Sequence, residues 1–83
     1  MTIHVKLMGV LRSRLPADSQ AGKATLQLDS GLTISGLLEH FGLAHGQVHL
    51  VLVNGEMAAD RSRPLSDGDE VTVFPPVAGG QGE

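Results

Sequence analysis

Residues 48–58, Val-His-Leu-Val-Leu-Val-Asn-Gly-Glu-Met-Ala, predict a β-hairpin. The apolar run from Val48 to Val53, interrupted by His49, has the length and composition of a buried strand. Asn54 and Gly55 follow it directly, and both tolerate the positive φ angles of a two-residue hairpin turn. Residues 56–58 then supply a short returning strand.

An amphipathic helix is predicted on the N-terminal side of this hairpin. Thr33 is a good N-cap, because its hydroxyl can accept a hydrogen bond from an unpaired backbone N–H of the first turn. Gly42 suits the left-handed position that ends a helix. Between them one apolar face repeats at i, i+3, i+4 and i+7, formed by Ile34, Leu37, Leu38 and Phe41.

Three further segments alternate between apolar and polar residues and predict strands: 2–8, 23–28 and 70–74. Residues 9–22 lose this periodicity and predict a loop, with one helical turn near 10–14. Residues 66–69, Ser-Asp-Gly-Asp, predict a turn. The expected class is therefore α+β, with one main helix packed across a mixed sheet of four to five strands. The first two strands are expected to pair antiparallel.

Composition limits the kinds of function. Eighty-three residues make one domain, and so small a chain has little room for a deep active-site cleft. We therefore expect a carrier or a non-catalytic subunit rather than an enzyme, with no catalytic residue of its own. The absence of Cys excludes disulfides and thiolate chemistry. The six basic residues are scattered, so no nucleic-acid partner is expected.

Neither a secretory signal nor a membrane segment is predicted. The N-terminus lacks a signal-peptide pattern, and no apolar run is long enough to span a bilayer, so a cytoplasmic protein is expected. His45 and His49 are spaced i, i+4 but lie in a segment expected to be mostly strand, without a third ligand. No metal site is therefore predicted. Asp67 and Asp69 are interpreted as turn residues rather than a catalytic pair.

The C-terminal residues have a different character from the domain. We place the domain at 1–74 and a flexible tail at 75–83. Pro75 and Pro76 lack N–H donors, so they end the sheet ladder and lead the chain away in an extended form. Val77, Ala78, Gly79 and Gly80 then decrease in side-chain size. Such a tail could enter a narrow tunnel, with residues 75–79 as its binding segment.

Three stretches together carry a resemblance to a known family: Val51-Leu52-Val53-Asn54-Gly55-Glu56, Pro64-Leu65-Ser66-Asp67-Gly68-Asp69-Glu70-Val71, and Phe74-Pro75-Pro76-Val77-Ala78-Gly79-Gly80. The chain resembles the family of the molybdopterin synthase small subunit and the thiamine sulfur carrier. Its ending is more similar to the molybdopterin branch. The resemblance implies a ubiquitin-like β-grasp fold and a sulfur-carrier function.

The resemblance also implies a reaction and partners. An E1-like adenylating enzyme, using ATP and magnesium, would adenylate the carboxylate of Gly80, which would then become a thiocarboxylate. The carrier, which binds no cofactor itself, would deliver its sulfur to a synthase subunit for cofactor biosynthesis. A ubiquitin-like protein modifier, joined through Gly80 to a lysine, is one alternative. A β-grasp interaction subunit that is never activated is another.

Gly80 departs from the family pattern because Gln81-Gly82-Glu83 follow it. Only a terminal carboxylate can be adenylated, and the carbonyl of Gly80 is tied up in an amide. The favoured interpretation is a precursor from which a peptidase removes residues 81–83. Two other interpretations are open. The domain has left the activation pathway and is a binding module that kept the tail, or Glu83 itself is activated.

A partner-binding surface is predicted from strand parity. Met8 and Phe74 fall on the outward face and become neighbours if the first and last strands are parallel, so we expect an exposed contact patch. Arg61 and Arg63, in the loop before the last strand, are expected to contribute to the same partner surface.

Overall fold

The computed structural model describes residues 1–15 and 22–76. Residues 16–21 and 77–83 lie outside them, and with them most of the predicted tail. The elements follow in chain order: β1 (Thr2–Leu7), η1 (Gly9–Arg14), β2 (Lys23–Gln27), α1 (Ile34–His40), η2 (His45–Gln47), β3 (Leu50–Val53), β4 (Glu56–Met57) and β5 (Glu70–Phe74). The two η elements are 3-10 helices.

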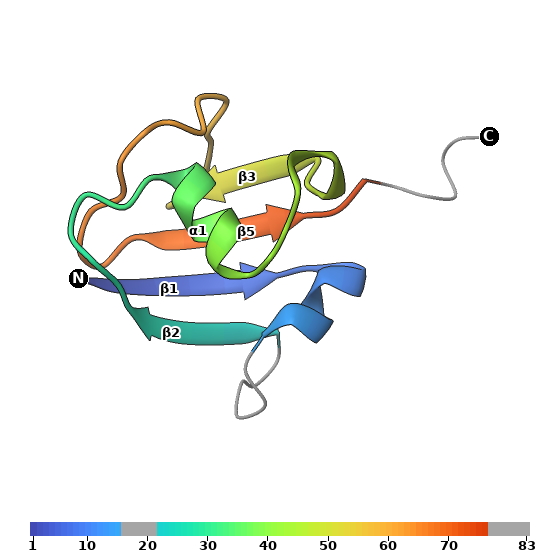
Figure 1. Ribbon diagram of the computed structural model, residues 1–83, viewed down its shortest axis with the longest axis horizontal. Helices are drawn as coiled ribbons and strands as arrows, with labels where there is room; N and C mark the ends of the chain where they lie inside the picture. Colours follow the sequence, from blue (N-terminus) through green and yellow to red (C-terminus); the bar gives the residue numbers. More distant parts are fainter. Residues whose placement is uncertain (16–21, 77–83) are drawn as a thin grey trace.

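The strands form one mixed sheet in the order β2-β1-β5-β3-β4 (Figure 1). The first and last strands of the chain, β1 and β5, are parallel neighbours at its centre. The remaining pairs are antiparallel, including β1 with β2 as predicted. This confirms the α+β class and gives five strands.

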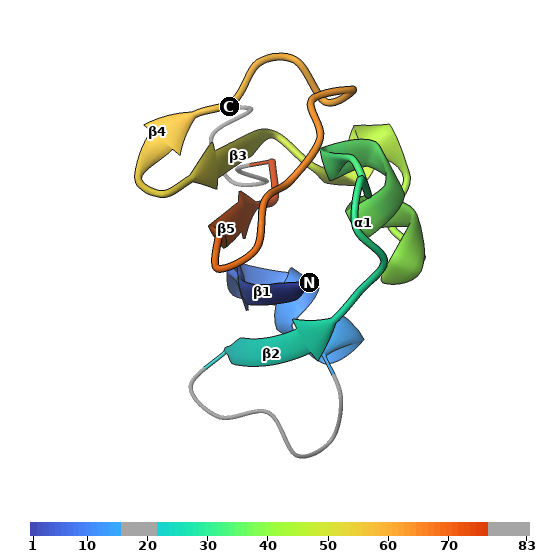
Figure 2. The same cartoon turned by 90° about the vertical axis from the view of Figure 1, so that its left-hand side faces the viewer.

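Helix α1 covers one face of the sheet (Figure 2). The side-chain oxygen of Thr33 accepts a hydrogen bond from the backbone N–H of Gly36 at 3.1 Å, as its N-cap role predicts. Gly42 has φ +72° and follows the last turn, which confirms the predicted helix end. The apolar helix face is buried, so α1 contributes Ile34, Leu37 and Leu38 to the core.

The core is aliphatic apart from Phe41 and lies between α1 and the inner face of the sheet. The inward-facing strand residues are almost completely buried: Ile3, Val5, Leu7, Val51, Val53, Val71 and Val73. Leu11 of η1 and Leu65 of the loop before β5 belong to the same buried cluster. At roughly 25 cal/mol per Å² of apolar surface, this burial is the main force that holds the sheet to the helix.

The turns behave as their sequences predict, with one exception. Asn54 and Gly55 have φ +54° and +84°, which confirms the β3–β4 hairpin. Residues 45–47, however, form a 3-10 turn, so the expectation that the segment from His45 to His49 is mostly strand is wrong. Ala44 and Gln47 explain the difference, because the N–H of Ala44 donates to the side chain of Gln47 while the N–H of Gln47 donates back to the Ala44 carbonyl. These bonds close a turn, and β3 begins only at Leu50.

Candidate functional site

The root of the predicted tail is held against Gly9, the first residue of η1. Strand β5 ends at Phe74, and Pro75 is half-buried while Pro76 is exposed. Pro75 packs over Gly9, where an added Cβ would lie 3.2 Å from the Pro75 Cγ. Gly9 has φ +56°, a left-handed conformation that glycine adopts without steric cost. Both the backbone angle and the contact therefore favour glycine at this position.

Met8 and Phe74 lie side by side at this root, as predicted. Leu7 pairs with Val73 in the parallel ladder, so the next step sets Met8 beside Phe74. The N–H of Met8 donates to the Val73 carbonyl at 3.0 Å, which extends the pairing by one residue. Both side chains are half-buried rather than fully open. They therefore form the edge of a surface and not a projecting patch.

The apolar surface continues beyond this pair across the face of the sheet that α1 does not cover. Phe74 is opposite Leu50, and Leu52 is opposite Met57. Met57 is 70% exposed, which is unusual for a large apolar side chain. We call Met8, Leu50, Leu52, Met57 and Phe74 the outer apolar strip. Met57 is exposed and the other four side chains are partly exposed, so the strip offers adjoining apolar surface that suits a protein-binding site.

Sequence reasoning missed three members of this strip. Strand β3 is apolar on both faces, and that pattern was interpreted as burial on both sides. It contains two of the missed residues, Leu50 and Leu52, and pairs with the third, Met57. The useful signal was that successive residues of β3 point to opposite faces of the sheet. Val51 and Val53 fill the inner face, and no element in the described ranges covers the outer face. Val10, 80% exposed on η1 next to Gly9, was also missed.

Arg61 and Arg63 take part in the hydrogen bonds that hold the loop before β5. The guanidinium of Arg61 donates to the Val48 carbonyl at 3.0 Å. The backbone carbonyl of Arg61 accepts from the N–H of Ser35 at 2.8 Å. The carbonyl of Arg63 accepts from Ile34 at 3.1 Å, while its side chain is exposed. The loop is thereby tied to the first turn of α1. Their predicted role in partner binding stays a prediction.

The acidic turn before β5 is structural. The Asp69 carboxylate is buried and accepts from the Ser66 N–H at 2.8 Å and from Asn54 Nδ2 at 2.9 Å. Asp67 accepts from the Thr2 N–H at 2.7 Å. These bonds confirm that the aspartates serve the turn, and they fix the start of β5 relative to the hairpin and β1. The position of the tail root depends on that start.

Hydrogen bonds from the Ser62 side chain and backbone lower the pKa of the exposed Asp60 carboxyl. Within residues 1–15 and 22–76, no cluster of three or more His, Asp or Glu is arranged to hold a metal ion. No helix in those ranges is long and apolar enough to cross a membrane.

Comparison with known proteins assigns the family. The ThiS family profile matches residues 5–80, which run from β1 through the Gly-Gly pair. The chain belongs to the ThiS family. The matched range ends at Gly80, so Gln81-Gly82-Glu83 lie beyond the part that ThiS proteins share. The resemblance seen in the sequence is thereby confirmed. No curated protein matches the sequence.

Solved structures support this assignment and the β-grasp fold. Small archaeal modifier protein 1 (SAMP1) from Haloferax volcanii is 26% identical, with a TM-score of 0.68 over 96% of this chain and 100% of SAMP1. A putative subunit 1 of molybdopterin converting factor from Pyrococcus furiosus is also 26% identical, with a TM-score of 0.67 over 92% of this chain and 98% of that one.

A third structure is similar in fold alone. It is a complex of subunits 1 and 2 of the molybdopterin-converting factor from Helicobacter pylori, 20% identical, with a TM-score of 0.61 over 96% of this chain and 100% of that chain. The similar structures therefore include a small archaeal modifier protein and subunits of molybdopterin-converting factor, and this chain shares their β-grasp fold.

Proposed function

We propose that this chain is a sulfur carrier, a protein co-substrate whose Gly80 carboxylate is activated and thiocarboxylated by partner enzymes. The observation that supports this most is the ThiS match, which extends through the Gly-Gly pair and ends at Gly80. The name of the Pyrococcus furiosus relative favours molybdopterin-type cofactor biosynthesis as the destination of the sulfur.

The chemistry requires a free carboxylate at Gly80. Removal of residues 81–83 by a peptidase would expose it. The carboxylate would then attack the α-phosphate of ATP, with magnesium on the phosphates, to form an acyl-adenylate and release pyrophosphate. A sulfur nucleophile would replace AMP and leave a thiocarboxylate. In the synthase, the thiocarboxylate sulfur would attack an electrophilic carbon of the acceptor, and water would then hydrolyse the resulting thioester, which leaves the sulfur on the acceptor and returns the Gly80 carboxylate.

The described residues give the domain two tasks in this scheme, binding and positioning. Neither requires a catalytic side chain. The outer apolar strip would bind the E1-like adenylating enzyme. Pro75 and Pro76 would direct the tail away from the sheet, and the contact of Pro75 with Gly9 would set its direction. From Pro75 the reach to Gly80 is up to ~20 Å.

The test compares three forms of the chain: full length, ended at Gly80, and ended at Gly79. Each is incubated with the E1-like adenylating enzyme encoded in the same genome, ATP and magnesium, and ATP–pyrophosphate exchange is measured. We expect exchange only with the form that ends at Gly80. Exchange with full-length chain would contradict the need for trimming, and exchange with none would contradict activation itself.

One alternative has an observation in its favour. SAMP1 is described as a modifier protein, so an isopeptide bond between Gly80 and a lysine of another protein is a second candidate. Higher-mass adducts in cells that express the form ended at Gly80, absent for the form ended at Gly79, would support it. A thiocarboxylate without adducts would favour the carrier.

A further inference from the structure

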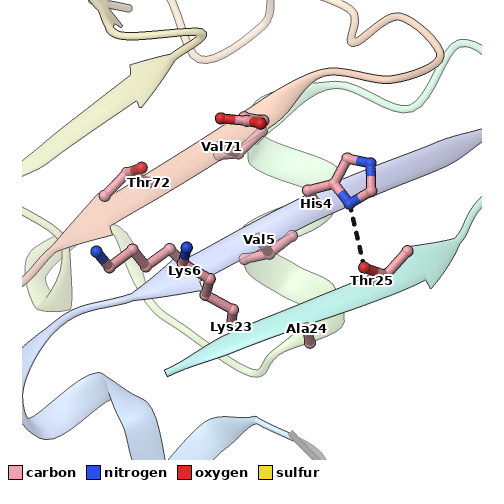
Figure 3. A pocket seen from close by; sticks show the side chains of 9 residues that line it. His4, Val5, Lys6, Lys23, Ala24, Thr25, Val71 and Thr72 are labelled. Atoms are coloured by element: carbon pink, nitrogen blue, oxygen red, sulfur yellow. Dashed lines mark hydrogen bonds between the residues drawn. The ribbon is translucent and has the colours of Figure 1, made fainter. Parts of the chain in front are cut away.

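The uncovered face of the sheet holds a shallow depression next to the outer apolar strip. It has a volume of about 400 Å³ and lies over β2, β1 and β5 (Figure 3). Six polar side chains line it: His4, Lys6, Lys23, Thr25, Glu70 and Thr72. The proposed sulfur-carrier function leaves this depression without a role.

Two lysines oppose each other in the depression. Lys6 on β1 pairs directly with Lys23 on β2, and Figure 3 shows their side chains beside each other. The backbone hydrogen bonds of this pair of strands join Leu7 with Gly22 and Met1 with Leu28. Lys6 and Lys23 therefore occupy a non-hydrogen-bonded site, where opposite Cα atoms are only about 4.5 Å apart and side chains are closest. Like charges directly opposite each other destabilise a sheet.

The described residues do not neutralise this pair. Neither ammonium group makes a hydrogen bond or ion pair within residues 1–15 and 22–76. The one carboxylate that lines the depression, Glu70, is in register with His4 rather than with a lysine. Two cations thus face one anion, a local excess of one positive charge in a chain whose net charge is −3. This local positive charge suits a ligand that carries negative charge.

The form of the depression indicates what kind of ligand fits. Its floor is a paired sheet, in which the ladder engages the backbone N–H groups of β1 and β5. A small phosphate is usually held by converging backbone N–H groups, and the floor offers none. Recognition falls to two ammonium groups and the hydroxyls of Thr72 and Thr25, the latter hydrogen-bonded to His4 Nδ1 at 3.1 Å (Figure 3). Such groups suit carboxylate side chains presented by an opposing protein surface.

The depression is continuous with the surface at the tail root. Lys6 pairs with Thr72, Thr72 with Leu52, and Leu52 with Met57, so one row of the sheet joins the lysines to the outer apolar strip. Lys6 also lies two residues before Met8, about 7 Å along the strand. An enzyme that covers the strip to receive the tail must therefore also cover the lysines.

We propose that this depression receives carboxylate side chains of the E1-like adenylating enzyme, so that Lys6 and Lys23 form the charged half of its docking surface. This rests on the proposed function. The enzyme neutralises the opposed lysines on binding and so removes their mutual repulsion. Their contribution is to affinity and not to the chemistry at Gly80.

The experiment uses the form ended at Gly80 in ATP–pyrophosphate exchange with that enzyme. The double variant Lys6→Gln/Lys23→Gln should raise KM by roughly tenfold with kcat unchanged. Arg12→Gln removes a charge on η1, outside the depression, and should leave KM near the wild-type value. At high salt the difference between double variant and wild type should disappear, because the Debye length falls from about 10 Å at 0.1 M to about 3 Å at 1 M.

A second readout separates this role from a structural one. Lys23→Gln alone should raise the thermal unfolding midpoint, since it relieves repulsion. A lower midpoint would show that Lys23 supports the fold and would overturn the inference. The inference would also be overturned if the double variant Lys6→Gln/Lys23→Gln had the same KM as Arg12→Gln. Saturable binding of inorganic phosphate in the depression, measured by amide NMR shifts, would overturn it too. Failure of the wild-type form to be adenylated at all would overturn the proposed function, and this inference with it.

Discussion

Gly9→Ala tests whether the start of η1 positions the tail. A Cβ at this position meets two obstacles. Gly9 has φ +56°, and a left-handed conformation costs an L-residue roughly 1–2 kcal/mol. The Cβ would also lie 3.2 Å from the Pro75 Cγ, so the proline ring must move by a few tenths of an ångström. The first effect lowers stability, and the second shifts the tail root.

The two effects can be separated with matched variants. Gly31 has φ +87° and nothing within 4 Å of an added Cβ, so Gly31→Ala carries only the conformational cost. Gly9→Asn tests mainly the close contact between the Cβ and the Pro75 ring, because asparagine adopts the left-handed region more readily than alanine and so has a smaller conformational cost. Both alanine variants should lower the unfolding midpoint by roughly 4–8 °C per kcal/mol lost. Gly9→Asn should lower it less.

The decisive readout is adenylation of the form ended at Gly80. Displacement by about 1 Å in an active site can cost roughly 100-fold, so a shift of a few tenths should lower kcat/KM about threefold. Gly9→Ala and Gly9→Asn should both show this loss, while Gly31→Ala retains wild-type kcat/KM at a temperature where all are folded. Equal kcat/KM for Gly9→Ala and Gly31→Ala would refute the positioning role.

Three further predictions concern the turn, the helix and the outer apolar strip. Asp69→Ala leaves the Ser66 N–H and Asn54 Nδ2 without their acceptor and should lower the free energy of unfolding by about 2–4 kcal/mol; a loss below about 1 kcal/mol in urea titration would show that the carboxylate does not hold the turn. Thr33→Ala should cost about 1 kcal/mol, with Thr33→Ser close to wild type; equal midpoints for the two would contradict the cap. Phe74→Asp should weaken binding to the adenylating enzyme while the unfolding midpoint stays within a few degrees, and unchanged affinity would remove Phe74 from the docking surface.

Local signals predicted much of this fold because they act within a few residues. Asn54-Gly55 specifies its turn through backbone angles, and Thr33 with Gly42 marks both ends of the helix. The neighbouring positions of Met8 and Phe74 required one further step, the parallel pairing of the first and last strands. The family resemblance supplied that step.

Long-range register was the part that sequence could not provide. Lys6 and Lys23 oppose each other only because β1 and β2 pair in one particular register. The connection between them, residues 8–22, is too long for a turn type to fix that register. Arg61 shows the same limit, since nothing local indicates that its guanidinium reaches the Val48 carbonyl. The exposed face of β3 was missed because an apolar strand does not say which of its faces is covered.

The most direct test of the central claim is the intact mass of the protein recovered from its native cells. The sulfur-carrier account predicts a chain that ends at Gly80, part of it heavier by the replacement of one carboxylate oxygen with sulfur. That fraction should return to the carboxylate mass when the sulfur acceptor is supplied. A mass that still includes Gln81-Gly82-Glu83, with no thiocarboxylate form, would contradict the account.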